Sequence, residues 1–327
     1  MVKSFTKYIA IVLMILCGLL TSGVLTGCGY ISFEIVIDEP AVPLAGLQPE
    51  FSIPMPSSPG YLTQSNDRAV IDYSNMRDGY VTVEYLENTD RMLRVVITSP
   101  GDSSYIYDLN PDKSDKFPVS EVLPLTEGNG LYTIGVYRHN EDAKYTPVLL
   151  TSVEVELVEE AAPFIRPSQI VNYGEKSLAV ETAAELVPAS GCYFGTIESI
   201  LTFVVDNIEF DAEFLEIAEG RYIPDIDSTI TLGSGICYDI AVLTAAMLRS
   251  QGIPTKLVVG YYDDIRVGAV YHAWITVYSE VSGQAGGHTF YGDAWNILDP
   301  TLIIGDGFRK AAQIAADGSR YNAMFYY

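Results

Sequence analysis

The sequence predicts an α+β protein in which an all-β domain precedes a mixed domain of helices and strands. Three observations support this prediction. Short runs rich in Val, Ile and Tyr, separated by turn residues, occupy residues 66–160. Apolar residues recur at helical spacing between residues 178 and 254, and strand-like runs follow them. The chain of 327 residues also has enough material for about two hydrophobic cores.

Residues 1–27 are expected to form a targeting segment that lies outside any fold. A basic start precedes an unbroken apolar run at residues 8–20, and Leu-Thr-Gly-Cys follows at residues 25–28. This pattern is similar to bacterial lipoprotein signals, and the resemblance implies cleavage before Cys28 and acylation of its sulfur. The protein would then be lipid-anchored on the extracellular face of a cell membrane. An uncleaved anchor is the alternative, although the apolar run is short for a helix that spans a bilayer.

The segment after the expected cleavage point is rich in proline. Residues 28–65 contain six prolines and few periodic apolar residues, which predicts an extended tether that holds the body off the membrane. The whole chain carries a net charge of −23, and its pI is near 4.3. Such a charge argues against nucleic-acid binding, because a polyanion would be repelled.

The all-β domain is expected at residues 66–160 and fits an immunoglobulin-like or fibronectin-like sandwich. No cluster of residues in it suggests chemistry, so it is interpreted as a spacer or as a domain that binds a wall polymer. Residues 161–177, which include two prolines, are expected to link it to the second domain. The predicted strands are residues 69–73, 80–86, 92–98, 104–109, 131–138 and 146–158.

The second domain, residues 178–327, is predicted to place helices first and strands after them. A polar loop at residues 220–233 is expected to lead into an apolar helix that ends near Gly252 and Pro254. This order predicts that the helix packs on an antiparallel sheet. The other predicted helices lie near residues 178–186 and 197–204, and the predicted strands at residues 256–262, 270–278 and 288–298.

The apolar helix of this domain begins with a cysteine, Cys237. A helix start has unpaired N–H groups and the positive end of the macrodipole, which favour the nucleophilic thiolate. Gly235, which has no Cβ, would let backbone or substrate approach the sulfur. The alternative is a buried apolar cysteine. A disulfide to Cys192 would block the thiol, so Cys192 is expected to be free, with the disulfide as the alternative in an exported protein.

A histidine and a carboxylate on the following strands could complete a catalytic group. His272 lies on a predicted strand face, from which it could take the thiol proton and return it to a leaving group. The alternative is a core histidine with a satisfied hydrogen bond. Asp299 ends the next strand, before Pro300, and could orient the imidazole. Asp293 competes for this role, and Asp299 is preferred because Asp293 follows a glycine that still belongs to a turn.

Four blocks of sequence occur in the order 235–239 (GICYD), 247–254 (MLRSQGIP), 272–274 (HAW) and 295–301 (WNILDPT). Together they closely resemble the core of the bacterial transglutaminase-like superfamily, which has a papain-like fold. The resemblance implies that Cys237 is the nucleophile, His272 the base and Asp299 the orienting acid.

The chain also departs from animal transglutaminases. Tyr238 stands where those enzymes place a tryptophan, and no Asp-rich loop has calcium-binding spacing, which argues against calcium-dependent crosslinking. No metal and no cofactor is expected. Asp239 is expected to complement the helix dipole. Trp274 and Trp295 are interpreted as walls of the cleft or as core, and His288, which follows two glycines, is expected to be exposed.

The expected chemistry is acyl transfer through a Cys237 thioester, on amide bonds of a peptide or protein such as a cell-wall peptide. The backbone N–H of Cys237 would contribute to an oxyanion hole, and the hydroxyl of Tyr222 is a candidate for the second donor. Water as acceptor would make the enzyme a peptidase or amidase, and an amine would make it a transferase. The alternative function is a surface lipoprotein without catalysis that binds wall peptide or a protein partner.

Overall fold

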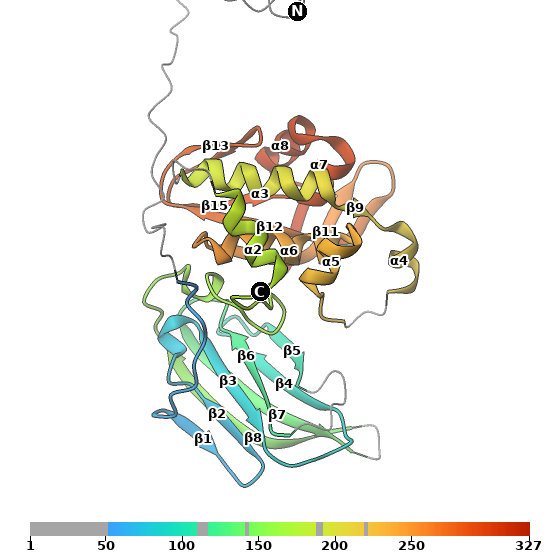
Figure 1. Cartoon of the computed structure of the whole chain (residues 1–327). Coiled ribbons are helices and arrows are strands. Elements are labelled where there is room, and N and C mark those ends of the chain that lie inside the picture. Colours follow the sequence, from blue (N-terminus) through green and yellow to red (C-terminus); the bar gives the residue numbers. More distant parts are fainter. Residues whose placement is uncertain (1–51, 110–116, 141–143, 188–191, 219–221) are drawn as a thin grey trace, which may run out of the picture. The chain divides into compact units, whose positions relative to one another are not determined.

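The computed structural model describes residues 52–109, 117–140, 144–187, 192–218 and 222–327 (Figure 1). All of them belong to one compact unit that extends from residue 41 to residue 327. The expected signal segment, Cys28 and the tether up to residue 51 lie outside the described residues. In the described ranges, no helix has both the length and the hydropathy to cross a membrane.

The upstream part of the chain forms a β domain of two four-stranded sheets, in which all strand pairs are antiparallel. One sheet has the order β1 (Thr63–Ser65), β2 (Ala69–Asp72), β3 (Tyr80–Tyr85) and β6 (Val119–Pro124). The other has the order β5 (Ser104–Asp108), β4 (Leu93–Thr98), β7 (Gly130–His139) and β8 (Tyr145–Val155). A short helix η1 (Met76–Asp78) precedes β3.

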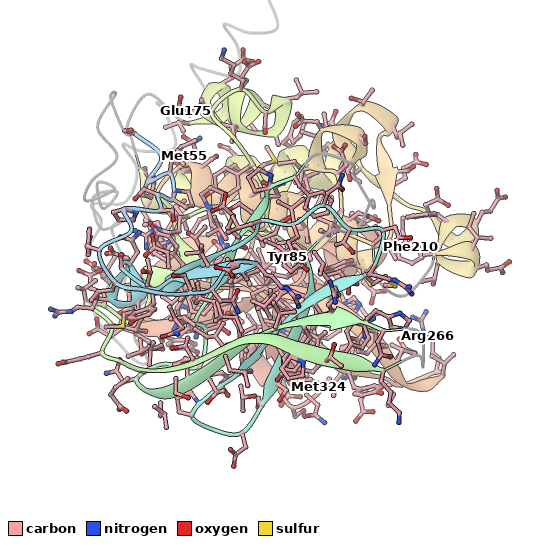
Figure 2. The ribbon with its side chains drawn as sticks, turned by 90° about the horizontal axis from the view of Figure 1, so that it is seen from below. Met55, Tyr85, Glu175, Phe210, Arg266 and Met324 are labelled. Atoms are coloured by element: carbon pink, nitrogen blue, oxygen red, sulfur yellow. The ribbon has the colours of Figure 1, made fainter. Side chains whose placement is uncertain are left out.

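Alternating burial explains how the two sheets share one core. Side chains of β4 alternate between buried and half-buried, so that Leu93, Val95 and Ile97 point inward. Tyr85 of β3 is fully buried in the same cluster, whereas Met324 of the second domain lies at the surface (Figure 2). The predicted strands of this region are present, and β1 and β6 are additional. β1 belongs to the last part of the expected tether, which is therefore paired with β2.

The second part of the chain forms a mixed domain around an antiparallel sheet. The sheet has the order β15 (Ala294–Leu298), β12 (Gly268–Ser279), β11 (Thr255–Asp264) and β16 (Tyr321–Tyr326). Five helices precede its first strand: α2 (Leu178–Leu186), α3 (Tyr193–Asn207), α4 (Ala212–Ile217), α5 (Ile226–Leu232) and α6 (Cys237–Ser250). Two short strand pairs complete it, the parallel pair β9 (Glu209–Phe210) and β10 (Ser234–Gly235) and the hairpin β13 (Gly283–Ala285) and β14 (His288–Phe290). The chain ends with α7 (Pro300–Asp306), α8 (Phe308–Asp317) and β16.

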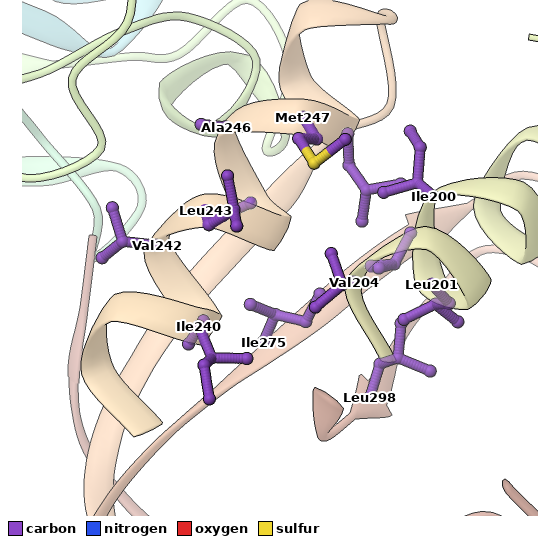
Figure 3. Packing of buried hydrophobic residues seen from close by; sticks show 14 of the residues in the cluster. Ile200, Leu201, Val204, Ile240, Val242, Leu243, Ala246, Met247, Ile275 and Leu298 are labelled. Carbon is purple, nitrogen blue, oxygen red and sulfur yellow. The ribbon is translucent and has the colours of Figure 1, made fainter. Parts of the chain in front are cut away.

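Helix α6 lies at the centre of this domain and is buried from Asp239 to Ser250. It contacts α2, α3, α5 and α7 as well as strands β11 and β12. Ile240, Leu243 and Met247 of α6 belong to one buried cluster with Val204 of α3 and Ile275 of β12 (Figure 3). A helix surrounded by such a core is held rigidly along its length, and so is the residue at its start.

The structure corrects the predicted elements at three places. The expected polar loop at residues 220–233 contains α5, whose N-cap Asp225 accepts hydrogen bonds from two backbone N–H groups of the first turn. The expected strand at residues 288–298 is divided into β14 and β15 by a turn in which Asp293 has a φ of 51°. Helices α7 and α8 and strand β16 were not predicted.

The expected linker at residues 161–177 is packed into the body of the protein. It contains the 3-10 helix η2 (Ala162–Phe164) and the buried side chains of Phe164 and Val171. The ring of Phe164 meets that of Trp295 edge to face at 5.2 Å. This segment therefore shares its packing with strand β15 of the mixed domain.

Candidate active site

The first turn of α6 holds Cys237 in a closely packed setting. Oδ2 of Asp239 accepts hydrogen bonds from the N–H of Ile236, at 2.9 Å, and from the hydroxyl of Tyr222, at 2.9 Å. A Cβ on Gly235 would lie 2.7 Å from the Cβ of Asp239, so only glycine fits there. Cys237 itself is a free thiol with partial exposure. The nucleophile candidate is thus fixed in position and still accessible.

Strand β12 supplies His272, which is 8% exposed. Its register partner on β11 is Gly260. A Cβ on Gly260 would lie 2.1 Å from the carbonyl oxygen of Asn322, so the glycine allows β16 to approach β11 beside the histidine. The ring of Tyr262 packs on the imidazole with 5.6 Å between ring centroids, and Trp274 stacks on it at 6.1 Å. The imidazole is therefore confined on several sides.

Asp299 is fully buried and stands between β15 and α7. Its Oδ2 lies 2.8 Å from Nε2 of His272 and accepts a second hydrogen bond from the hydroxyl of Tyr321 at 3.1 Å. Its Oδ1 accepts the N–H of Leu302 at 3.0 Å, which makes Asp299 the N-cap of α7. One carboxylate thus both starts a helix and fixes the ring of His272.

The electrostatics of this group favour a charged imidazole. Burial lowers the pKa of His272, but the Asp299 carboxylate and a hydrogen bond with the Cys237 side chain outweigh it and raise the pKa to about 10. Because Nε2 is bonded to Asp299, Nδ1 is the ring nitrogen left for the sulfur. An imidazole held between a carboxylate and a cysteine sulfur is an arrangement that can move a proton to and from the sulfur.

A cavity of about 490 Å³ opens over these residues, and Cys237, Tyr238 and His272 line it. Its other walls come from β5, the linker, α4 and residues 218, 222 and 223, β11, β12, β16 and Tyr327. Asp299 lies behind His272 and is not part of the lining. A substrate in this cavity would therefore meet the sulfur and the imidazole, and the carboxylate would act only through the ring.

The structure shows which of two aspartates, Asp293 or Asp299, lies beside His272. Asp293 is exposed in the turn before β15 and makes no contact with His272 among the described residues, whereas Asp299 does. Cys192 is a free thiol at the N-terminus of α3, so the prediction of a free Cys192 is confirmed. Trp274 is buried, and Trp295 packs on Phe164.

Two expectations about individual side chains were wrong. His288 is 4% exposed, because β14 lies beneath α8 and the imidazole turns back to the carbonyl of Gly286 at 3.1 Å. The proton of the Tyr222 hydroxyl is already donated to Asp239, so this group is not a free oxyanion donor. Tyr321 is the site residue that sequence reasoning missed, because it lies in a C-terminal strand that no motif marks.

Comparison with known proteins gives one match to a family model. Residues 181–300 match the model of the transglutaminase-like superfamily, and this segment contains Cys237, His272 and Asp299. This segment of the mixed domain is therefore similar to the transglutaminase-like superfamily. No curated protein sequence matches the chain.

Three solved structures illustrate the likeness of this chain to known folds. A protein described as a candidate cysteine protease from Cytophaga hutchinsonii is 15% identical, with a TM-score of 0.36, over 73% of this chain and 68% of that one. The periplasmic domain of TgpA from Pseudomonas aeruginosa is 14% identical, with a TM-score of 0.32 and coverage of 76% and 77%. Red sea bream transglutaminase is 13% identical, with a TM-score of 0.32 and coverage of 71% and 49%. The similarity to the family rests on the sequence match and not on these scores.

Proposed function

We propose that the mixed domain is a thiol acyl-transfer enzyme that acts on amide bonds of peptides or proteins. Cys237 is its nucleophile, His272 its general base and acid, and Asp299 the residue that orients the imidazole. The observation that carries this proposal is the 2.8 Å contact between Nε2 of His272 and Oδ2 of Asp299, which leaves the other ring nitrogen for the Cys237 sulfur.

In the first half of the reaction, the thiolate of Cys237 attacks the carbonyl carbon of the amide. The negative charge on the carbonyl oxygen is stabilised by the backbone N–H of Cys237 at the start of α6. The tetrahedral intermediate collapses to a thioester as the C–N bond breaks, and the imidazolium of His272 gives its proton to the departing amine. Asp299 keeps the ring in place throughout.

In the second half, water or an amine attacks the thioester while neutral His272 takes its proton. Collapse releases the acyl group and returns the pair of thiolate and imidazolium. Hydrolysis would define a peptidase or amidase, and aminolysis a transglutaminase-type transferase. Products formed from a wall peptide with and without an added primary amine, read by mass spectrometry, distinguish the two.

The activity itself is tested by alkylation of the two thiols. Iodoacetamide at neutral pH is expected to modify Cys237 at least about tenfold faster than Cys192, because only Cys237 pairs with an imidazolium. The His272→Ala variant should lose this difference, and Cys192→Ala should leave the rate at Cys237 unchanged. Equal rates in the wild-type protein would instead favour a binding protein without catalysis.

We also propose that the protein is a lipid-anchored surface protein whose β domain is an immunoglobulin-like sandwich. Support for the anchor is the Leu-Thr-Gly-Cys pattern at residues 25–28, and support for the sandwich is the shared core of two antiparallel sheets. The tether would end before β1, the sandwich would extend from β1 to residue 160, and residues 161–177 would form a packed connection to the enzyme at residues 178–327. Expression of Cys28→Ala in a bacterial host should move the protein from the membrane fraction to the soluble fraction.

A further inference from the structure

One wall of the candidate active-site cavity comes from the upstream β domain. Four residues of β5 line the same cavity as Cys237 and His272: Ser104, Ile106, Tyr107 and Asp108. Strand β5 stands at the edge of its sheet, and among the described strands it pairs only with β4. The cavity is therefore bordered by a strand edge, which is the part of a sheet that can accept another strand.

The hydrogen-bond pattern shows which backbone groups of β5 point away from β4. At one end of the pair, the N–H of Leu109 donates to the carbonyl of Leu93, and at the other the N–H of Ser99 donates to the carbonyl of Ser103. In an antiparallel pair the direction alternates, so the odd-numbered residues of β5 bond to β4. The backbone groups of Ser104 and Ile106 consequently face outward, and they have no outward partner among the described residues.

The outward edge has a defined end. The carbonyl of Asp108 accepts a hydrogen bond from the side-chain amide of Gln169 at 2.9 Å. A strand that paired with β5 would therefore have to stop before Asp108. The open edge is therefore short, and its residues Ser104 and Ile106 line the same cavity as Cys237.

Apolar side chains converge on this cavity from three separate elements. Ile106 of β5 is 47% exposed, Leu215 of α4 is 50% exposed, and Tyr271 of β12 is 63% exposed. Each of these side chains lines the cavity. An apolar side chain of a bound molecule that packed against them would remove apolar surface from water, which favours binding. Together with the outward N–H and C=O groups, they form a surface that is polar along one edge and apolar beside it.

We propose that the edge of β5 binds the substrate polypeptide of the proposed enzyme as an added β-strand, a subsite that the upstream domain contributes. The substrate is an extended segment whose backbone pairs with Ser104 and Ile106 and whose apolar side chain, next to the reacting amide, packs among Ile106, Leu215 and Tyr271. This inference rests on the proposed function. A helical segment would not fit, because its backbone groups are already bonded internally.

The test measures binding without catalysis, in the full chain that carries Cys237→Ala. The probe is a fluorescein-labelled peptide with valine on either side of a central glutamine and lysine at both ends, and fluorescence anisotropy reports its binding. Ile106→Ala removes the side chain but keeps the outward N–H, whereas Ile106→Pro also removes that N–H, which an edge strand tolerates. Leu150→Ala is the matched control, because Leu150 is 50% exposed on β8, the opposite edge of the same sheet.

Binding is expected to weaken about threefold or more in Ile106→Ala and a further two- to tenfold in Ile106→Pro, with no change in Leu150→Ala. A probe methylated on the amide nitrogen of one valine should lose affinity for the Cys237→Ala protein by a similar factor. Because this change is made in the probe, the fold of the protein is not affected. Absence of saturable binding, equal affinity for the methylated probe, or an equal loss in Leu150→Ala would overturn the proposal. If Cys237 and Cys192 react at equal rates but the peptide still binds as expected, the proposed enzyme function is wrong and the proposed peptide-binding edge of β5 is supported.

Discussion

At the scale of single residues, the ion pair of His272 makes stability depend on pH. Its pKa in the folded protein is about 10, against an ordinary value of 6.5. Below pH 6.5 the imidazole is charged in both states and the contribution of the pair is fully present. As the pH rises through about 10, the folded protein loses the proton and the contribution disappears.

The first prediction compares the wild-type protein with His272→Gln in urea at several pH values. The free energy of unfolding of the wild type minus that of His272→Gln should decrease by an amount on the order of 4 kcal/mol between about pH 6 and pH 11. Cys237→Ala should show a smaller loss over this interval than the wild type, because the sulfur also raises the pKa of His272. A difference that stays constant with pH would contradict the ion pair.

Tyr321 is a positioning residue at the same scale, because its hydroxyl donates to the carboxylate oxygen that also bonds His272. Tyr321→Phe removes one hydrogen bond and keeps the ring. We expect kcat to fall about threefold to tenfold with little change in KM, and the pH profile of kcat to shift. Tyr291→Phe, which changes an exposed tyrosine, is the control and should leave both constants and the profile unchanged.

At the scale of elements, Asp299 joins two functions that substitutions can separate. It caps α7 through Oδ1 and orients His272 through Oδ2. Asparagine is an equally good N-cap but cannot stabilise the imidazolium, and alanine can do neither. Both Asp299→Asn and Asp299→Ala should lower kcat by about a hundredfold or more.

Stability measurements distinguish the two Asp299 variants. Urea unfolding should show Asp299→Ala less stable than Asp299→Asn by about 1 kcal/mol, the usual contribution of a cap. Equal stability would mean that α7 does not depend on its N-cap. Retained activity in Asp299→Asn would mean that the carboxylate does not orient the base.

At the scale of the whole molecule, a buried arginine connects segments that are distant in sequence. Arg249 at the end of α6 is fully buried and donates to the carbonyls of Thr255, Arg166 and Tyr327, at 2.8, 3.1 and 2.6 Å. Burial lowers its pKa to about 10, so the guanidinium remains charged at neutral pH. The guanidinium thus bonds to backbone oxygens of the linker, of β11 and of the residue after β16.

Removal of this guanidinium should destabilise the molecule strongly. Arg249→Met would leave buried carbonyls without donors, and we expect a loss of about 3 kcal/mol or more in the free energy of unfolding. Arg309→Met, on the exposed face of α8, should change it by less than about 0.5 kcal/mol. A similar effect of the two substitutions in urea unfolding would show that Arg249 does not hold these segments together.

Local patterns explain which parts of this architecture were predictable. Strands such as β4 alternate in burial along their own sequence, and α6 carries its apolar residues and its stop signal within one stretch, so both were predicted closely. The short helices α4 and α5 were missed because they have only six and seven residues, too few to show a helical period, and their limits depend on the caps Asp211 and Asp225. His288 was misjudged because its burial depends on α8, which follows it in the chain.

The sequence by itself determined the order of the main elements and pointed to Cys237, to His272 and to a carboxylate at Asp299 or Asp293, because each stands in a local pattern that a single stretch of chain can carry. Only the tertiary structure decided between Asp299 and Asp293, added Tyr321 to the carboxylate and brought β5 to the cavity. Those decisions depend on strand register and on the packing of distant segments, and such contacts leave no periodic signal in the residues that make them.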